Sequence, residues 1–120
     1  MVLRCLIVDD SADFREAART LLERQGVNVV AVASTGEEAL ARAGELRPDV
    51  TLIDIDLNGE SGFTVARKLV DDGGVNEGTV ILISAYAREE FADLIEASPA
   101  AGFVSKSDLS ADAIGALLER

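Results

Sequence analysis

Four short apolar runs, each ending abruptly at a polar or charged residue, constrain the fold of this chain most strongly. The runs span 5–8, 50–53, 80–83 and 102–105, and the residues that follow them are Asp9, Asp54, Ser84 and Lys106. Strands this short and this apolar are typical of a parallel sheet that is covered on both faces. Because ligands bind at the edge of an open α/β sheet where the carboxyl ends of its strands meet, we expect these polar side chains to converge.

Helical spacing separates the apolar runs. One stripe with i, i+3, i+4 spacing is formed by Phe14, Ala17, Ala18, Leu21 and Leu22. Comparable signals predict helices at 35–47, at 63–70, around Phe91, Leu94 and Ile95, and from a Ser110 N-cap to 118, and the Val-rich segment 27–33 indicates a fifth strand. Five strands that alternate with five helices predict a doubly wound α/β sandwich that occupies residues 1–120 as one domain. Periodicity alone leaves the strand order open.

The charge of the chain excludes several classes of partner. Its net charge is −11 and its pI is about 4.3, whereas binding to nucleic acid or to an anionic membrane needs clustered Lys and Arg. No apolar stretch approaches the length of a membrane span, and the one after Arg4 is too short for a secretory signal. Cys5 is the only cysteine, so we expect a buried thiol, no intrachain disulfide and a reducing, cytoplasmic location.

Asp9, Asp10 and Asp54 form a predicted acidic cluster. Two adjacent carboxylates after a strand could simply cap the next helix, but the addition of Asp54 favours a cation site. Two carboxylates about 4 Å apart repel by roughly 4 kcal/mol at an effective dielectric near 20, and a divalent cation offsets that repulsion. The chain has no His and a single Cys. A ligand set made of oxygen alone therefore favours Mg²⁺ over Zn²⁺.

Asp54 has a second predicted role, as a nucleophile. A carboxylate can accept a phosphoryl group to form an acyl phosphate, and such transfers are promoted mainly by positioning and charge neutralisation. The Lys106 ammonium can neutralise charge, and the Ser84 hydroxyl can donate a hydrogen bond to a phosphoryl oxygen. Taken singly, Lys106 reads as a surface lysine and Ser84 as a strand-end residue. Their joint placement at strand ends favours a phosphoryl site.

Five segments, in this order and spacing, together resemble the receiver domain of two-component response regulators. The segments are 6–10, 48–54, 59–62, 83–85 and 102–106, so the resemblance extends over essentially the whole sequence. It implies a flavodoxin-like fold with strand order 2-1-3-4-5. It also implies a signalling switch that accepts a phosphoryl group on an aspartate.

The resemblance assigns roles to the acidic residues and the lysine by position. Asp54 matches the phosphoacceptor, Asp10 a direct Mg²⁺ ligand, and Asp9 a ligand that acts largely through water. The backbone carbonyl of Asp56 would also contact the metal. Lys106 matches the lysine that contacts the phosphoryl group.

Ser84 and Phe103 match the switch pair of the family. In receivers the aromatic ring turns inward when the hydroxyl moves to the phosphoryl group, which remodels the face of helix 4, strand 5 and helix 5. Phe103 read alone is an ordinary core aromatic, a role compatible with switching. The resemblance implies a sensor histidine kinase or phosphotransfer protein as partner, and it leaves open a homodimer through the same face.

Two positions differ from the pattern frequent in the family. Asn58 and Ser107 stand where receivers often have proline. Asp56 and Tyr86 occupy positions that in receiver domains flank the route of water to the acyl phosphate, and we hypothesise that they set the lifetime of the phosphorylated state.

Two readings from other classes stand beside this one. Asp54-Ile55-Asp56 resembles the Asp-x-Asp pair of haloacid-dehalogenase-like phosphatases, although that motif normally follows the first strand and here follows the third. A receiver-like adaptor that is never phosphorylated usually lacks an acidic or lysine position, and this chain keeps them all. We therefore expect a switch that catalyses only its own phosphorylation and dephosphorylation, and not an enzyme with another substrate.

Overall fold

The computed structural model describes residues 2–119 and contains a five-stranded parallel sheet. Its strands are β1 (Arg4–Val8), β2 (Asn28–Ala33), β3 (Val50–Asp54), β6 (Val80–Ser84) and β7 (Gly102–Ser105). They lie in the order β2-β1-β3-β6-β7, which is 2-1-3-4-5 when only these five are counted. The fold class and the strand order that the family resemblance predicted are therefore confirmed.

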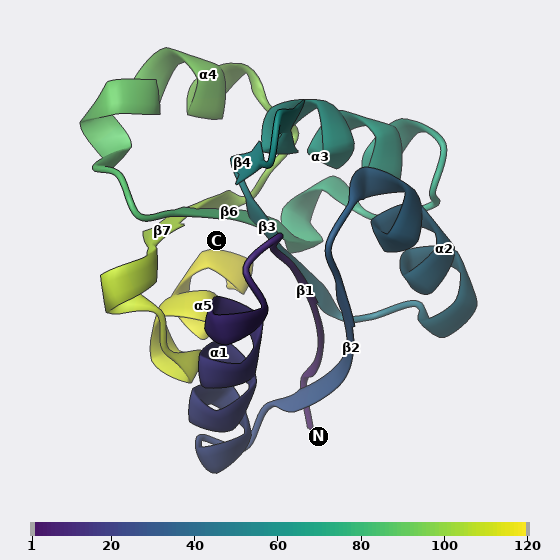
Figure 1. The fold of residues 1–120 in the computed structure, drawn as a ribbon, viewed down its shortest axis with the longest axis vertical. Helices are drawn as coiled ribbons and strands as arrows, with labels where there is room; N and C mark the ends of the chain where they lie inside the picture. The colour runs from purple at the N-terminus through teal and green to yellow at the C-terminus, as the bar shows by residue number, and fades with distance from the viewer. Residues whose placement is uncertain (1, 120) are drawn as a thin grey trace.

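Helices cover both faces of this sheet. They are α1 (Ala12–Arg24), α2 (Gly36–Leu46), α3 (Gly62–Asp71), α4 (Ala92–Ala97) and α5 (Ala111–Leu118), with short 3-10 turns η1 (Glu77–Thr79), η2 (Arg88–Phe91) and η3 (Lys106–Asp108). In Figure 1, α1 and α5 lie together on one side of the sheet, and α2 and α3 lie on the other. None of the helices within residues 2–119 is long and apolar enough to cross a membrane.

Strand alternation divides the core into two layers. Leu6 and Val8 of β1 pack in the layer that contains the buried residues of α2 and α3, whereas Cys5 and Ile7 pack with those of α1 and α5. Successive side chains of a strand point to opposite faces, so each strand contributes to both layers. Cys5 is fully buried, and burial raises the pKa of its thiol to about 12, as expected for an unreactive core residue.

Four hydroxyl side chains fix where helices begin. Ser11, Thr35, Ser61 and Ser110 accept hydrogen bonds from the backbone N–H groups of Phe14, Glu38, Thr64 and Ala113. The predicted cap at Ser110 is thus confirmed. The Ser11 cap begins α1 directly after the Asp9-Asp10 pair.

In α1 and α4 only part of the apolar residues face the core. Ala18 and Leu22 of the α1 stripe are buried, but Leu21 is 38% exposed and Ala17 is exposed as well. The contact with the sheet covers only the row Phe14, Ala18 and Leu22, which is narrower than the sequence stripe. In α4, Leu94 is 54% exposed and Ile95 is buried. A six-residue helix buries only a small part of its circumference.

The segment after Asp54 forms a small hairpin. Strands β4 (Asp56–Leu57) and β5 (Glu60–Ser61) pair antiparallel. The turn residues Asn58 and Gly59 have φ of 52° and 93°, as a two-residue type I′ turn requires, and Asn-Gly is the preferred sequence for it. Asn58 therefore fixes the loop through turn geometry at a position where receivers often use proline.

The hairpin leads into a tight contact between α3 and the end of β3. An added Cβ at Gly62 would lie 2.0 Å from the backbone oxygen of Asp54. The Gly62 N–H also donates to the Ile55 carbonyl at 2.9 Å. Glycine at this position lets the start of α3 approach the backbone of Asp54.

We expect Gly62→Ala to lower the free energy of unfolding by about 2 to 3 kcal/mol, because the methyl group would overlap backbone that cannot move aside. The matched control is Gly44→Ala within α2, where an added Cβ meets nothing within 4 Å. That change should raise stability by about 0.5 to 1 kcal/mol through helix propensity. Urea unfolding measures both variants, and a Gly62→Ala protein as stable as wild type would contradict the close approach.

Candidate functional site

The Lys106 ammonium joins two aspartates from separate strands. Its Nζ lies 2.7 Å from Asp9 Oδ2 and 2.8 Å from Asp54 Oδ2. Lys106 follows β7 at the edge of the sheet, whereas Asp54 ends β3 and Asp9 follows β1. The predicted convergence of these three residues is therefore observed, and the lysine side chain reaches it by crossing the end of β6.

The second oxygen of each carboxylate is held by backbone. The N–H of Ser11 donates to Asp9 Oδ1 at 2.8 Å, and the N–H of Asp56 donates to Asp54 Oδ1 at 3.0 Å. Each carboxylate is thus fixed between an amide of the following loop and the lysine. Such charge-assisted contacts orient both groups before any ligand arrives.

The charged side chains of the ion pairs are largely shielded from solvent. Asp9 is fully buried, Asp54 is 7% exposed, and the Lys106 side chain is 19% exposed. Burial raises the pKa of Asp54, against the lowering effect of the Asp56 amide and Lys106, and nearby Asp9 adds to the rise. Burial lowers the pKa of Lys106, but its hydrogen bonds with Asp54 and Asp9 outweigh this and the net pKa is raised. The lysine therefore stays cationic at neutral pH.

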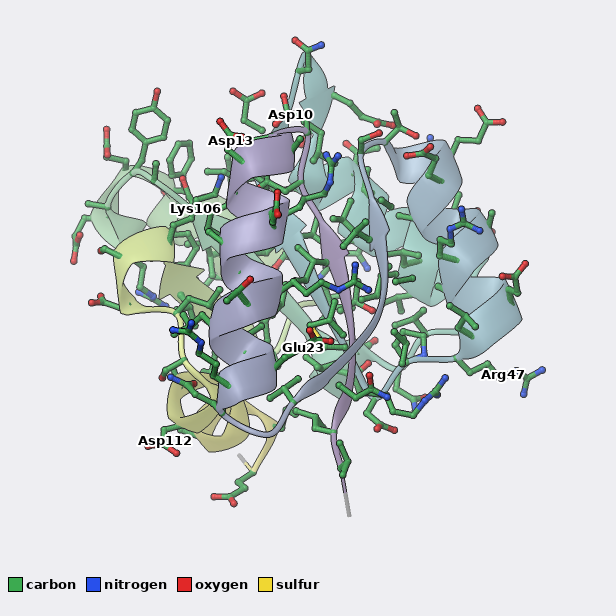
Figure 2. The ribbon with its side chains drawn as sticks, turned by 60° about the horizontal axis from the view of Figure 1, so that its bottom comes forward. Asp10, Asp13, Glu23, Arg47, Lys106 and Asp112 are labelled. Atoms are coloured by element: carbon green, nitrogen blue, oxygen red, sulfur yellow. The ribbon has the colours of Figure 1, made fainter. Side chains whose placement is uncertain are left out.

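The acidic cluster fits a divalent cation. Carboxylate oxygens of Asp9, Asp10 and Asp54 lie within 4.8 Å of one another. Asp10 is exposed while the other two are buried, so one member faces the solvent from which an ion would come. Figure 2 shows Asp10 at the amino-terminal end of α1, with Lys106 near the same end of that helix. An oxygen-only set of this kind suits Mg²⁺. A role for the Asp56 carbonyl stays a prediction.

Ser84 and Phe103 lie on the opposite face of the sheet from the ion pairs. Phe103 packs against the core layer that contains Leu82, and strand alternation places Ser84 on that same face of β6. Ser84 is 1% exposed, and its Oγ accepts a hydrogen bond from the Tyr86 N–H at 3.0 Å. Because Ile83 pairs with Asp54 and Ser84 pairs with Ser105, the hydroxyl lies one residue beyond the position of Asp54, on the neighbouring strand.

Three contacts at this edge were not predicted from the sequence. The ring of Phe14 lies under the Lys106 ammonium, 4.2 Å from Nζ to its centroid. The Arg15 guanidinium donates to the Asp9 carbonyl at 2.7 Å, and Glu60 Oε1 accepts from the Gly36 N–H at 2.8 Å. Phe14 fits the apolar stripe of its helix, and no local pattern signals its contact with a lysine far along the chain. The Glu60 contact depends on the hairpin.

Comparison with known proteins decides the family. A family model described as the response regulator receiver domain matches residues 5–117. The chain belongs to this family. The matched residues 5–117 include every residue of the site described above.

Individual relatives share this receiver region. The response regulator GacA of Pseudomonas viridiflava is 32% identical over 117 residues, which are 97% of this chain and 54% of that protein. A protein-glutamate methylesterase/protein-glutamine glutaminase of Archaeoglobus fulgidus is 33% identical over 108 residues, which are 88% of this chain and 30% of that protein. The crystal structure of a LuxR-family two-component response regulator from Aurantimonas sp. SI85-9A1 has a TM-score of 0.84 at 30% identity and covers 99% of this chain and 86% of that one.

The chain spans about half, or less, of the length of these two curated relatives. One is named as a regulator and the other as an esterase. What they share with this chain is the receiver, so the match establishes a receiver of two-component signalling and leaves the output of the whole protein undetermined.

Asp54→Asn tests the charge balance of the site through stability. Since the pKa of Asp54 is raised from 3.8 in the folded state, the folded protein holds that proton more tightly than the unfolded chain does. Ionised Asp54 therefore costs stability, and the cost grows as the pH rises through the raised pKa. In metal-free buffer Asp54→Asn should have a higher Tm than wild type at pH 7, with a gain that shrinks toward pH 4.

Magnesium provides the control for this measurement. Added Mg²⁺ should raise the Tm of wild type more than that of Asp54→Asn, because the amide is the weaker ligand. A variant less stable than wild type at pH 7 without metal would contradict the charge balance described above.

Proposed function

We propose that this receiver is a Mg²⁺-dependent switch in which Asp54 accepts a phosphoryl group from a phosphohistidine of a sensor kinase or phosphotransfer protein. The observation that supports this most strongly is the Lys106 ammonium, which lies 2.8 Å from Asp54 Oδ2 and 2.7 Å from Asp9 Oδ2. One cation that contacts both the acceptor and the acidic cluster can follow the negative charge as it moves from carboxylate to phosphoryl group.

The transfer is a displacement at phosphorus. A carboxylate oxygen of Asp54 forms a bond to phosphorus while the P–N bond of the phosphohistidine breaks, and its electron pair stays on the imidazole nitrogen as the ring takes up a proton. The product is an acyl phosphate that carries about −1.5 to −2 charges. Lys106 neutralises part of this charge, and the Asp56 amide, which already donates to Asp54 Oδ1, keeps the acceptor oriented.

The side chains of Asp9, Asp10 and Asp54, together with the Asp56 carbonyl, are the groups that we propose to hold Mg²⁺. When bound, the ion neutralises charge on the phosphoryl group and aligns it with the acceptor. Asp9 is held on its other oxygen by the Ser11 amide, so it needs no rearrangement to stay in the cluster.

Ser84 is the proposed link to the rest of the molecule. Its Oγ now accepts from the Tyr86 N–H at 3.0 Å. When the hydroxyl turns to donate to a phosphoryl oxygen, this hydrogen bond is lost and the loop that follows β6 is freed to move. Phe103, on the same face of the sheet, then repacks. The face of α4, β7 and α5 changes as a result, and the phosphoryl group biases the two arrangements.

The proposed setting follows from the charge and the family. We infer that residues 1–120 act as one receiver domain in the cytoplasm, with a histidine kinase or phosphotransfer protein as donor. The net charge of −11 disfavours direct binding of nucleic acid by this domain. The α4, β7 and α5 face is the surface through which a homodimer would form. The domain would catalyse only its own phosphorylation and dephosphorylation.

Incubation with Mg²⁺ and acetyl phosphate should add one phosphoryl group to the wild-type chain, detected by intact-mass spectrometry. Asp54→Asn should show no such adduct, because no carboxylate is left at the acceptor position, and EDTA should abolish the adduct in wild type. No adduct on wild type would favour an unphosphorylated adaptor. Sustained hydrolysis of a phosphomonoester by the isolated chain would favour a phosphatase.

Asp56→Asn should lengthen the lifetime of the phosphorylated state. Asp56 and Tyr86 line the same 390 Å³ hollow, which also includes Ile55, the residue after Asp54, and we propose that water approaches the acyl phosphate past them. A carboxylate and a phosphoryl charge about 6 Å apart in water repel by roughly 0.7 kcal/mol, so removing the carboxylate relieves this repulsion in the acyl phosphate and should slow its hydrolysis about threefold. Loss of the adduct over time measures the rate.

The matched control is Asp71→Asn, the same change at the end of α3 that lies away from the site. Its dephosphorylation rate should equal that of wild type. If Asp56→Asn and Asp71→Asn dephosphorylate alike, Asp56 has no part in the lifetime.

A further inference from the structure

We propose that Phe14 is a positioning residue for phosphoryl transfer, whose aromatic face holds the Lys106 ammonium in place while its carboxylate partners change. The inference rests on the proposed function of Asp54 and adds to it a residue on α1. It begins from one contact, the 4.2 Å between Lys106 Nζ and the centroid of the Phe14 ring.

The ring is fixed by its place in α1. The Phe14 N–H donates to the Ser11 hydroxyl at 3.2 Å, in the cap that begins the helix. Its side chain is half-buried in the row that continues through Ala18 and Leu22. The same loop that aligns Asp9 through the Ser11 amide therefore also sets the position of the ring.

The ammonium has three N–H donors and two carboxylate partners, at 2.7 and 2.8 Å. The ring lies against the remaining part of its surface, and the Lys106 side chain is only 19% exposed. An aromatic face carries partial negative charge and attracts a cation at this distance, more strongly where water is excluded. Phe14 thus gives Lys106 an uncharged partner beside its two anionic ones.

The uncharged partner matters because both anionic ones change during the reaction. Asp54 loses its carboxylate charge when it becomes an acyl phosphate, and Asp9 shares its charge with the proposed Mg²⁺. The negative charge therefore passes from the Asp54 carboxylate to the phosphoryl oxygens, and the ammonium must move from one anionic partner to the other. The attraction of the ring is unchanged by either event. It keeps the ammonium over the site instead of letting it turn out to water.

An ordinary core phenylalanine makes a different prediction. If Phe14 serves only to fill space, its shape decides the outcome and the charge distribution of its ring is irrelevant. If the ring holds the ammonium, the negative charge of its face decides. Fluorination separates the two, because each fluorine withdraws electron density from the ring face and changes the shape very little.

The test is to replace Phe14 site-specifically with mono-, di- and trifluorophenylalanine and to measure phosphorylation by acetyl phosphate at saturating Mg²⁺. We expect the rate to fall stepwise with each fluorine, by about tenfold in total, as the cation–π attraction is removed. Phe14→Leu should show a similar loss, and Phe14→Tyr should retain most of the rate. The matched control is the same fluorinated series at Phe63 in α3. Phe63 does not contact Lys106, so the phosphorylation rate should not change along that series.

A spectroscopic readout tests the contact itself. The chain has two lysines, Lys68 and Lys106, so labelling lysine with ¹³C gives two sets of side-chain signals, which Lys68→Arg assigns. The ring current of Phe14 should shift the ε-CH₂ protons of Lys106 upfield of those of exposed Lys68. The shift should persist after phosphorylation and disappear in Phe14→Leu.

The outcomes separate this inference from the proposed function. If the unmodified chain is not phosphorylated on Asp54, the proposed function fails and the role of Phe14 fails with it. If the chain is phosphorylated but the fluorinated series at Phe14 is flat, or if Lys106 shows no ring-current shift, only the role of Phe14 is overturned. Loss of rate in the fluorinated series together with the shift supports it.

Discussion

The bridge from Lys106 to Asp9 and Asp54 is the interaction on which the rest of this structure depends. Lysine is placed after β7, two strands away from β3 and three from β1, and only a long side chain can cover that distance. Without it, two buried carboxylates would face each other unpaired, which proteins avoid strongly. The bridge does not remove the conflict entirely, since the pKa of Asp54 stays raised. The site therefore retains unfavourable charge repulsion between its carboxylates, and a bound cation would reduce it.

Strand alternation separates the chemistry of this domain from its readout. Asp9, Asp54 and Lys106 meet at the ion pairs beside α1, whereas Ser84 and Phe103 belong to the face covered by α3 and α4. The two sets lie at the ends of adjacent strands, because backbone pairing holds neighbouring positions of β3, β6 and β7 in fixed register. A phosphoryl group at the edge can be reached from both faces, so a change on one side can be felt on the other.

The sequence predicted the site residues that stand at the ends of strands. It did not predict contacts between side chains that are far apart in the sequence. Asp9, Asp54 and Lys106 could be placed together because each follows an apolar run, and parallel strands align such ends. Phe14 could not be placed, since its spacing is equally that of a core residue and its contact comes from the opposite end of the chain. The spacing of Phe91, Leu94 and Ile95 marked a helix, but it did not show which of them is buried, and the six residues of α4 bury Ile95 and leave Leu94 exposed.

The charge of the whole domain bears on which donors it accepts. A net charge of −11 surrounds a site whose reagent is itself anionic, so free phosphodonors approach against the field of the protein. Lys106 attracts an anionic donor only when the donor is already close to the site, because salt screens charges beyond about 8 to 10 Å. A protein donor with a basic surface gains from the same field that repels a small anion, and its association is accelerated. If Asp54 accepts a phosphoryl group as proposed, the surface charge therefore favours a protein donor with a basic surface over a small anionic donor, while Lys106 supplies positive charge at the strand ends.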